Sequence, residues 1–478
     1  TGIVGLITNH SWIENPTFKG MRQSLTRSFD QIYVIDLHGN LKKKEKSPDG
    51  SKDENVFDIE QGVAISIFVK AKKIEKRFWR ADWFGTRIDK YSRAVEFKHF
   101  NDLRNDFSEF LKNDTHPNDS EKIFKLDEIF DFFSLGVLTK RDSLVLDFDE
   151  NSLRSKIRFF LDRKNSTKIV SEKFSISERD RDGWDIENVR NNVSNFELRD
   201  YAFRPFDFRK ISYNKYLIAR PNKKVFSSVL NNSPALLSCR QSSAIGGNIF
   251  DAIFITESIS DQNYFRRGGA SVFPLFINLN IAKSENFFES GKVVNIRGKF
   301  YNFLFDTYKH RPSPEEIFGY IYAILHAPAY RIAFAEFLRL DFPRIPFVET
   351  RDQFQTLSEL GWELAQKHLL KDIPKTGLGK FFGQGDHVID KPVYSEELQT
   401  IAINKTQSFK PVSKAVWEFH IGGYQVIDKY LKSRKGRTLT LDEIETVEKI
   451  CNVLQFTIDQ MNKIDLLYQA AFPDHRKS

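Results

Sequence analysis

The sequence predicts an α/β segment at the N-terminus, a mixed α+β region after it and a helical C-terminal part. Apolar runs at residues 2–7 and 31–37 flank a helical stretch at 18–29, which is the order of a parallel strand–helix–strand crossover. Short mixed segments without an internal repeat follow from about residue 99 to 300. Capped amphipathic helices appear only later. We therefore predict domains at residues 1–98, 99–400 and 401–478.

The N-terminal segment has the pattern of a core element. Residues 3–7 read as a buried strand, which needs neighbours on both faces, and nothing upstream supplies them. We expect residue 1 to lie inside a domain whose first half is elsewhere. Residues 40–55 are charged, contain Pro and Gly and predict a mobile loop. Residues 63–69 alternate as a half-buried strand, pairing either with residues 31–37 or with residues near 78–83.

The later elements rest on local signals. We expect strands at residues 143–148, 211–218 and 271–278. Ser313 and Glu316 form a capping box with Pro314 at the first helical position, and Pro343 stops a second helix that ends near residue 340. A further helix is expected at 351–370, and Thr440 with Glu443 caps a long C-terminal helix.

Composition limits the class of protein. The 478 residues, 40% of them hydrophobic, suffice for two to four folded domains. Cys239 and Cys451 are too few for a disulfide framework, which favours the reducing cytoplasm. No apolar run approaches the roughly 18 residues of a membrane span, and the N-terminus lacks the pattern of a secretory peptide.

The net charge of +8 is concentrated in one stretch. Residues 199–240, called the basic stretch below, contain nine Lys or Arg and two Asp. Such a concentration is typical of a protein that binds a polyanion, because each neutralised phosphate releases counterions. A solvated surface rim would have the same composition, so the charge alone leaves both readings open.

The order of several sequence blocks resembles type ISP restriction-modification enzymes. The first blocks, GIVGLITNHSWIENPTFKGMRQSLTRSFDQIYVIDLHGN and NVFDIEQGVAISIFVK, resemble the target-base half of a DNA adenine-N6 methyltransferase domain. Later blocks, including IEKRFWRADWFGTRIDKY, LRDYAFRPFDFRKISYN and VWEFHIGGYQVIDKYLKSRKGRTLTLDEI, are similar to the specificity region. The resemblance implies the C-terminal half of a Rossmann-like methyltransferase sheet, followed by a DNA target-recognition domain.

In that family the AdoMet-binding motifs and the Asn/Asp-Pro-Pro-Tyr/Phe tetrapeptide precede the strand that we place at residues 3–7. Asn15-Pro16-Thr17 lacks the second Pro and the aromatic residue, and predicts only a helix start. Residues 381–385 (FFGQG) fit a Phe-x-Gly-x-Gly pattern, but a Lys, Pro and Gly-rich stretch precedes them in place of a buried strand. The resemblance implies that AdoMet is bound mainly by the absent N-terminal half. We therefore expect this chain alone to be inactive and to bind no cofactor.

The resemblance also implies a residue that contacts the target base. Phe57 matches the family position whose aromatic ring contacts the extruded adenine, and stacking on a flipped base stabilises by roughly 1–3 kcal/mol. An ordinary core phenylalanine is the competing interpretation. The cations just before it could contact phosphates or be solvated; they are Lys42, Lys43 and Lys44.

The basic stretch supplies most of the candidate DNA-binding residues. Arg suits bidentate contact with guanine and Lys suits phosphate. The candidates are Arg204, Arg209, Lys210, Arg220, Lys223, Lys224 and Arg240, with Arg266 and Arg267 in a second loop. Phe203, Phe206 and Phe208 are expected to anchor the segment in the core. For Arg204 and Asp207, a structural ion pair remains an equal alternative.

Other chemistry has no signal in the sequence. His326, His368, His387 and His420 lack metal-ligand spacing, and we predict no metal site. We find no P-loop and no nuclease motif. The expected function is DNA sequence recognition and target-base positioning, with duplex DNA and the N-terminal methyltransferase half as partners. A stand-alone specificity module that acts with a separate catalytic subunit, and an RNA-directed enzyme, remain alternatives.

Overall fold

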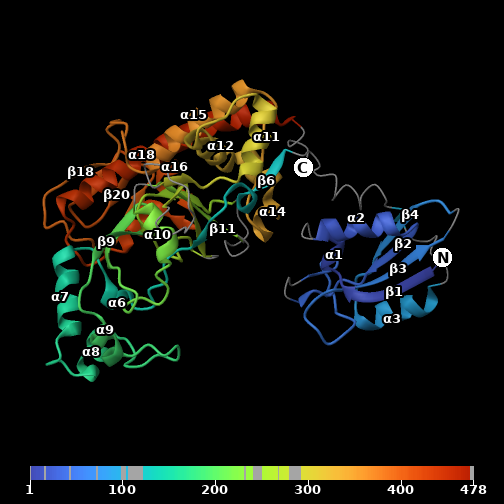
Figure 1. The fold of residues 1–478 in the computed structure, drawn as a ribbon, viewed down its shortest axis with the longest axis horizontal. Coiled ribbons are helices and arrows are strands. Elements are labelled where there is room, and N and C mark those ends of the chain that lie inside the picture. The colour runs from blue at the N-terminus through green and yellow to red at the C-terminus, as the bar shows by residue number, and fades with distance from the viewer. Residues whose placement is uncertain are drawn as a thin grey trace. The chain divides into compact units, whose positions relative to one another are not determined.

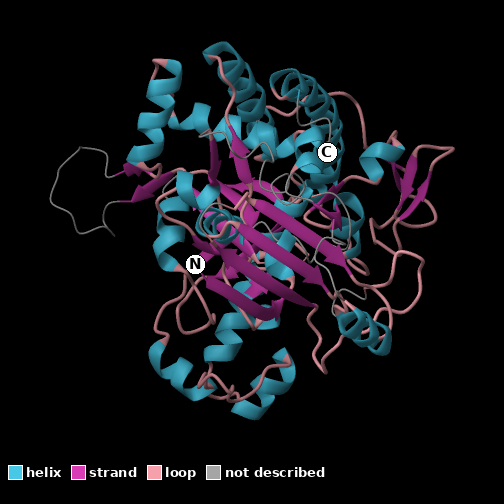
Figure 2. Cartoon of the chain, turned by 90° about the vertical axis from the view of Figure 1, so that its right-hand side faces the viewer, coloured by secondary structure: helices cyan, strands magenta, loops and turns pink. Residues whose placement is uncertain are grey.

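The computed structural model describes residues 2–14, 18–41, 45–71, 74–97, 104–105, 122–230, 233–240, 250–266, 269–278 and 292–473. The chain forms two compact units, Thr1–Glu121 (unit 1) and Lys122–Ser478 (unit 2), and each is described by itself. Both contain strands and helices, so the chain is mixed α+β (Figure 2). The predicted domain limits at residues 98 and 400 stay predictions.

Unit 1 is built around one five-stranded sheet in the order β1-β3-β2-β4-β5 (Figure 1). Its elements are β1 (Gly2–Asn9), α1 (Ser11–Glu14), α2 (Lys19–Ser28), β2 (Gln31–Asp36), β3 (Val63–Lys70), β4 (Arg77–Asp82), α3 (Arg87–Glu96) and β5 (Arg104–Asn105). The predicted strand–helix–strand order at 2–37 is confirmed. β3 runs antiparallel to both β1 and β2, so β1 and β2 are parallel to each other with β3 between them.

The prediction that residues 3–7 form a buried strand is half right. The residues do form β1, but Ile3, Val4, Leu6 and Ile7 are 72%, 42%, 46% and 59% exposed. The reason is that β1 lies at the edge of the sheet and pairs only with β3 among the described residues. An edge strand has a neighbouring strand on one side only, so its side chains are less covered than those of a central strand, whatever their composition.

The loop between β2 and β3 is exposed over much of its described length but is anchored by several buried polar residues. We predicted a mobile loop at residues 40–55, whereas Asn40, Ser47, Asp53 and Asn55 are buried in the structure. Hydrogen bonds from polar side chains replace the apolar periodicity that the sequence lacks here. The prediction of a loop is confirmed, and its described residues are tied to the sheet.

Unit 2 contains several small sheets. Its strands are β6 (Ile123–Lys125), β7 (Ser134–Leu135), β8 (Leu146–Asp147), β9 (Leu198–Arg204), β10 (Asp207–Ser212), β11 (Ala235–Cys239), β12 (Ile253–Thr256), β13 (Ile259–Ser260), β14 (Ala270–Pro274), β15 (Phe276–Asn278), β16 (Lys292–Val294), β17 (Arg344–Pro346), β18 (Lys380–Phe382), β19 (Val393–Ser395), β20 (Thr400–Ala402), β21 (Ser408–Lys410), β22 (His420–Ile421) and β23 (Tyr424–Gln425). Two four-stranded sheets, β13-β9-β10-β8 and β12-β11-β14-β7, contribute to the centre of its core.

Helices form much of the C-terminal part of unit 2 (Figure 1). The helices of unit 2 are α5 (Leu126–Ile129), α6 (Asp142–Val145), α7 (Glu150–Leu161), α8 (Thr167–Phe174), α9 (Ile186–Asn192), α10 (Lys223–Val229), α11 (Gly298–Tyr308), α12 (Pro314–His326), α13 (Pro328–Ala333), α14 (Ala335–Leu340), α15 (Arg351–His368), α16 (Lys414–Trp417), α17 (Val426–Lys432) and α18 (Leu441–Ala471). Among the described residues, no helix combines the length and apolar character that crossing a membrane requires.

The local predictions for unit 2 were right where caps defined them. The capping boxes of Ser313 with Glu316 and Thr440 with Glu443 both form, at the starts of α12 and α18. The strand predicted at 143–148 is wrong in its first half, because α6 occupies residues 142–145 and only β8 remains extended. The strand predicted at 211–218 ends at residue 212. Residues 381–385 begin in β18 and lead into a loop, not a helix.

Candidate nucleic-acid interface

Phe57 lies on the surface of the loop between β2 and β3. Its ring is 42% exposed, whereas the core phenylalanines Phe68 and Phe78 are 3% and 0% exposed. Asn55 holds the backbone here: its Oδ1 accepts from the Phe57 amide at 3.0 Å, and its Nδ2 donates to Gln61 O at 2.7 Å. The competing interpretation as a core residue is therefore not supported. A role in stacking on a base stays a prediction.

A fully buried ion pair anchors the same loop to α3. The Nζ of Lys90 on α3 lies 2.7 Å from Asp53 Oδ1, and both side chains are 0% exposed. Lys90 also donates to the carbonyls of Leu37 and Glu54 at 2.7 and 2.6 Å. Asp53 accepts from the amides of Gly39 and Gly85. Because nearly every polar atom of the pair is satisfied, it ties the start of the loop to the segment just before Phe57.

Sequence reasoning missed a second anchor, centred on His38. His38 Nδ1 lies 2.8 Å from Glu45 Oε1 and its Nε2 lies 3.0 Å from Asp82 Oδ1, while its ring stacks on Phe84. Burial alone would lower the pKa of His38, but these two hydrogen bonds and the charge of Asp36 raise it to about 9. His38 is therefore an imidazolium at neutral pH. The position of Asp36 and His38 at the end of a strand was the signal available in the sequence.

The structure also gathers a group of histidines and carboxylates that the sequence analysis did not identify, while the prediction of no metal site stays a prediction. The structure brings together His10, Asp36, His38, Glu45 and Asp82, with His10 Nδ1 at 2.9 Å from Asp36 Oδ1. Both ring nitrogens of His38 face carboxylate oxygens, so an imidazolium at this position donates two hydrogen bonds to them. In this protonation state the cluster is an ionic clamp on the loop. His326 and His368, by contrast, are buried in the core of unit 2.

Raising the pH is expected to weaken this clamp. The folded-state pKa of His38, about 9, exceeds its ordinary value of 6.5. Its contribution to stability is therefore complete below about pH 6.5 and is lost as the pH rises to about 9. We expect the protection of β2 and β3 amides in hydrogen exchange to fall across that range by about 2 kcal/mol, allowing for partly exposed partners.

A His38→Gln variant is expected to be less protected at pH 6.5 and to lose this pH dependence. His420→Gln, which changes an exposed histidine of unit 2, serves as the control. An identical pH profile in wild type and His38→Gln would contradict the clamp.

The clamp is also expected to weaken at acid pH. Burial by itself would raise the pKa of Glu45 and Asp82, but their hydrogen bonds to His38 lower both values to about 2. Their contribution is present above pH 4–5 and is lost as the pH falls to about 2.

In the basic stretch, the structure separates paired from unpaired cations. Five of the nine form ion pairs within unit 2: Arg199 with Glu197, Arg204 with Asp261, Arg209 with Asp207, Lys210 with Asp200 and Arg240 with Asp341. In the described part of the chain, the other four make no ion pair; these are Lys215, Arg220, Lys223 and Lys224. Within the basic stretch, these four charges are therefore the ones that no carboxylate of the described structure offsets through an ion pair.

Three of the unpaired cations lie together at the start of α10. Arg220, Lys223 and Lys224 are exposed, and the Arg220 backbone is bridged to Leu138. Asn222 between them takes a left-handed conformation and donates from Nδ2 to Leu135 O and Gly136 O. This fixes the turn that presents the cations. Their predicted DNA contact is compatible with this exposure and stays a prediction.

The β9–β10 hairpin differs from the prediction in two ways. Arg204 pairs with Asp261 and not with Asp207, at 3.4 Å. Phe203 and Phe206 are buried as expected, but Phe208 is 39% exposed, because the strand register shifts between Asp207 and Phe208. Asp207 takes the buried position and pairs with Arg434, a residue that the sequence analysis missed.

The remaining predicted residues fall in two groups. Arg266 is exposed, and its amide donates to Gly422 O at 2.8 Å. Arg240 is 64% exposed at the side chain although it contacts Asp341. The others lie outside the described residues; they are Lys42, Lys43, Lys44 and Arg267.

Comparisons with known proteins point to one family. The family model described as the type ISP C-terminal specificity domain matches residues 128–463. None of the curated proteins matches the sequence. Among solved structures, the chain is similar to the ATP-dependent type ISP restriction-modification enzyme LlaBIII bound to DNA, with 22% identity and a TM-score of 0.58 over 97% of this chain and 32% of that chain.

Two further solved structures have the same fold. One is a DrdV–DNA complex, with 21% identity, a TM-score of 0.57 and coverage of 97% of this chain and 50% of that chain. The other is a nuclease-deletion mutant of the type ISP enzyme LlaGI with a DNA substrate mimic, with 20% identity, a TM-score of 0.51 and coverage of 97% and 39%. The chain thus spans between a third and a half of the length of these solved chains.

Proposed function

The chain belongs to the family of type ISP C-terminal specificity domains, and from this membership we propose that it recognises the DNA target of a restriction-modification enzyme. In this proposal unit 2 binds duplex DNA. Unit 1 completes the methyltransferase sheet and positions the target adenine. Methyl transfer to the adenine N6 would depend on an N-terminal half that binds AdoMet.

The unpaired cations of unit 2 carry the proposal for DNA binding. Carboxylates offset five cations of the basic stretch, whereas Arg220, Lys223 and Lys224 are exposed and make no ion pair in the described structure. A solvated rim would not require them to be gathered at one ordered turn. Such a group suits contact with successive phosphates, which provide most of the affinity for DNA and make it depend on salt.

The topology of unit 1 supports the role in a methyltransferase. β1 and β2 are parallel strands joined through helix α2, which is the connection of Rossmann-like domains. Phe57 is exposed on a loop that two buried ionic anchors hold in place. A flipped base needs a fixed aromatic surface, because stacking is lost if the ring moves away.

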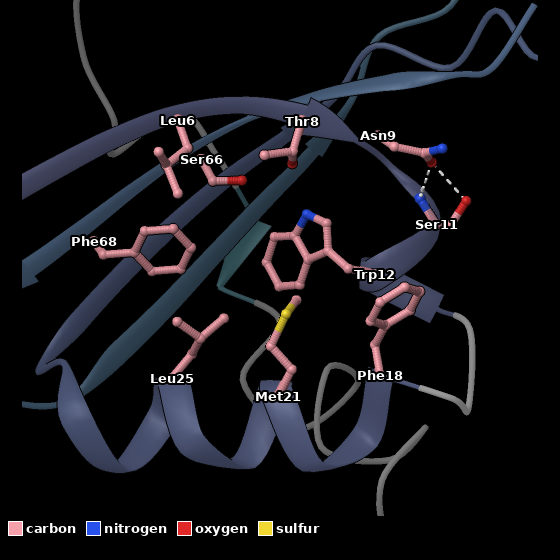
Figure 3. A pocket seen from close by; sticks show the side chains of 10 residues that line it. All are labelled: Leu6, Thr8, Asn9, Ser11, Trp12, Phe18, Met21, Leu25, Ser66 and Phe68. Atoms are coloured by element: carbon pink, nitrogen blue, oxygen red, sulfur yellow. Dashed lines mark hydrogen bonds between the residues drawn. The ribbon is translucent and has the colours of Figure 1, made fainter.

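The exposed edge of β1 supports a partner half. Its apolar side chains are exposed and no described strand pairs with its outer edge, so it offers a template for another strand. Beside it, an apolar pocket of about 400 Å³ lies between the sheet and α2. Figure 3 shows Trp12 projecting into this space between Phe68 and Met21. Phe18 and Met21 are 36% and 40% exposed, as expected of an apolar surface that a partner half covers.

The purified chain tests this proposal directly. We expect it to bind duplex DNA with an affinity that falls steeply as salt increases, and to transfer no methyl group when given AdoMet. Detected methylation would overturn the assignment of the cofactor site to the N-terminal half. Equal or stronger competition by RNA would favour the RNA-directed alternative.

The stand-alone alternative has its own test. If the reading frame upstream of residue 1 continues into Phe-x-Gly-x-Gly and Asn-Pro-Pro-Tyr motifs, both halves belong to one polypeptide. A natural start codon there would favour a specificity module that acts with a separate catalytic subunit.

A further inference from the structure

A cluster of cations and aromatic rings joins the β9–β10 hairpin to the C-terminal helices of unit 2. Its cations come from segments more than 200 positions apart in the chain and stack on a shared set of rings. The cluster, called the cation–aromatic cluster below, consists of Arg204, Arg209, Lys429, Arg434 and Arg437 with Phe148, Phe203, Tyr424 and Tyr430.

The inner half of the cluster is electrically balanced and structural. Arg434 is only 3% exposed at the side chain and lies between two carboxylates, with Asp207 Oδ1 at 3.0 Å from Nη2 and Glu443 Oε1 at 2.9 Å from Nε. Its guanidinium stacks on Tyr430 at 3.6 Å. Arg437 shares Glu443 at 3.2 Å. These contacts hold the hairpin against α17 and the start of α18.

The outer half has fewer carboxylates than cations. The guanidinium groups of Arg204 and Arg209 both lie on the ring of Phe203, at 3.9 and 3.6 Å from its centroid. Arg209 must share Asp207 with Arg434, and Arg204 reaches Asp261 only at 3.4 Å. The Nε of each arginine is buried without a hydrogen-bond partner in the described structure. The aromatic ring fixes both guanidinium planes while their charge is incompletely compensated.

Lys429 adds a third cation to this outer half. Its Nζ lies 5.3 Å from the centroid of Tyr424, and Arg204 approaches the same ring at 5.6 Å. The neighbouring Asp428 pairs with Lys432 at 2.8 Å, and Lys429 makes no ion pair among the described residues. Burial and the like charges of Arg204 and Arg209 lower the pKa of Lys429, and the carboxylates of Asp207 and Asp428 offset part of that effect. Three cations thus lie around the Phe203 and Tyr424 rings, where the nearest carboxylates are Asp261, paired with Arg204, and Asp207, which Arg209 shares with Arg434.

We propose that Arg204, Arg209 and Lys429 form a binding site for a backbone phosphate of duplex DNA. A phosphate placed among them would remove the repulsion between like charges and accept hydrogen bonds from oriented donors. Phosphate contacts set the register of a protein on DNA without reading sequence. This site therefore positions the hairpin on the duplex, and the inference rests on the proposed function of unit 2 in DNA binding.

If the cation–aromatic cluster had only a structural role, we would expect each of its cations to be paired with a carboxylate. A latch between the hairpin and α17 is stabilised when each cation has a carboxylate, as Arg434 has. Lys429 instead forms no ion pair in the described structure, and its charge is repelled by those of Arg204 and Arg209. Its substitution should therefore affect DNA binding more than folding.

The experiment compares Lys429→Ala with Lys432→Ala in the full chain. Both residues lie on α17, but Lys432 is exposed and already paired with Asp428. We expect the slope of log affinity against log salt, measured with a short mixed-sequence duplex, to fall by about one for Lys429→Ala. Affinity at low salt should fall several-fold. Lys432→Ala should keep the wild-type slope, and Lys429→Arg should restore it.

The outcomes separate this inference from the function on which it rests. If wild type shows no salt-dependent binding, both fail. If wild type binds and Lys429→Ala has the same slope as wild type or as Lys432→Ala, only the phosphate site is overturned. Thermal unfolding of the variants identifies a change that results from misfolding. Lys429→Glu, which reverses the charge at the same position, should weaken binding more than Lys429→Ala.

Discussion

Lys90→Met is expected to lower the free energy of unfolding of unit 1 by about 3–5 kcal/mol, because it leaves the Asp53 carboxylate buried without its cation. Both side chains are 0% exposed. The methionine side chain retains the apolar stem of the lysine, so the effect reports the lost charge and its hydrogen bonds to Leu37 O and Glu54 O. Hydrogen exchange of β2, β3 and the loop between them measures it.

A double variant and a surface control sharpen this test. Arg93→Met changes an exposed cation on the same helix and should alter stability by less than about 0.5 kcal/mol. Asp53→Asn combined with Lys90→Met should cost less than the sum of the two single changes, because neither charge then stays buried alone. Wild-type protection in Lys90→Met would mean that the ion pair does not hold the loop.

Replacing Arg220, Lys223 and Lys224 together with Ala is expected to weaken binding to duplex DNA on the order of a hundredfold at low salt. The salt slope should fall by about two to three, one for each phosphate contact removed. The reason is that these three exposed cations make no ion pair in the described part of unit 2. Affinity measured over a series of salt concentrations gives both quantities.

A matched change of net charge serves as the control. Replacing the exposed Lys164, Lys168 and Lys173, at and near α8, removes the same charge from another part of unit 2. An equal loss in both triple variants would mean that net charge alone drives binding. An unchanged slope in the first variant would remove the start of α10 from the interface.

Local sequence signals were sufficient for the helices of unit 2. Ser313 with Glu316 and Thr440 with Glu443 mark the first turns of α12 and α18, and both capping boxes form. These signals succeed because a cap involves atoms within one helical turn. The segment at 142–145 became α6 although its composition favoured a strand, because a short apolar run fits either state until its neighbours are known.

Long-range contacts decided the character of the candidate site. The sequence identified Phe57 and the concentration of positive charge, but not which cations are available. That depends on carboxylates brought in by the fold: Asp341 reaches Arg240, and Asp261 reaches Arg204. The clamp at His38 and the pair of Lys90 with Asp53 were missed for the same reason, since each joins residues from separate elements.

The sequence by itself determined the family resemblance, the strand–helix–strand order of unit 1 and the starts of the long helices. These depend on composition, periodicity and caps that act over a few residues. The tertiary structure decided that β1 is an exposed edge, that Asp207 pairs with Arg434 across 227 positions, and that Lys429 and Arg204 approach the same ring of Tyr424. Burial and charge compensation depend on distances in space, which the order of residues along the chain does not specify.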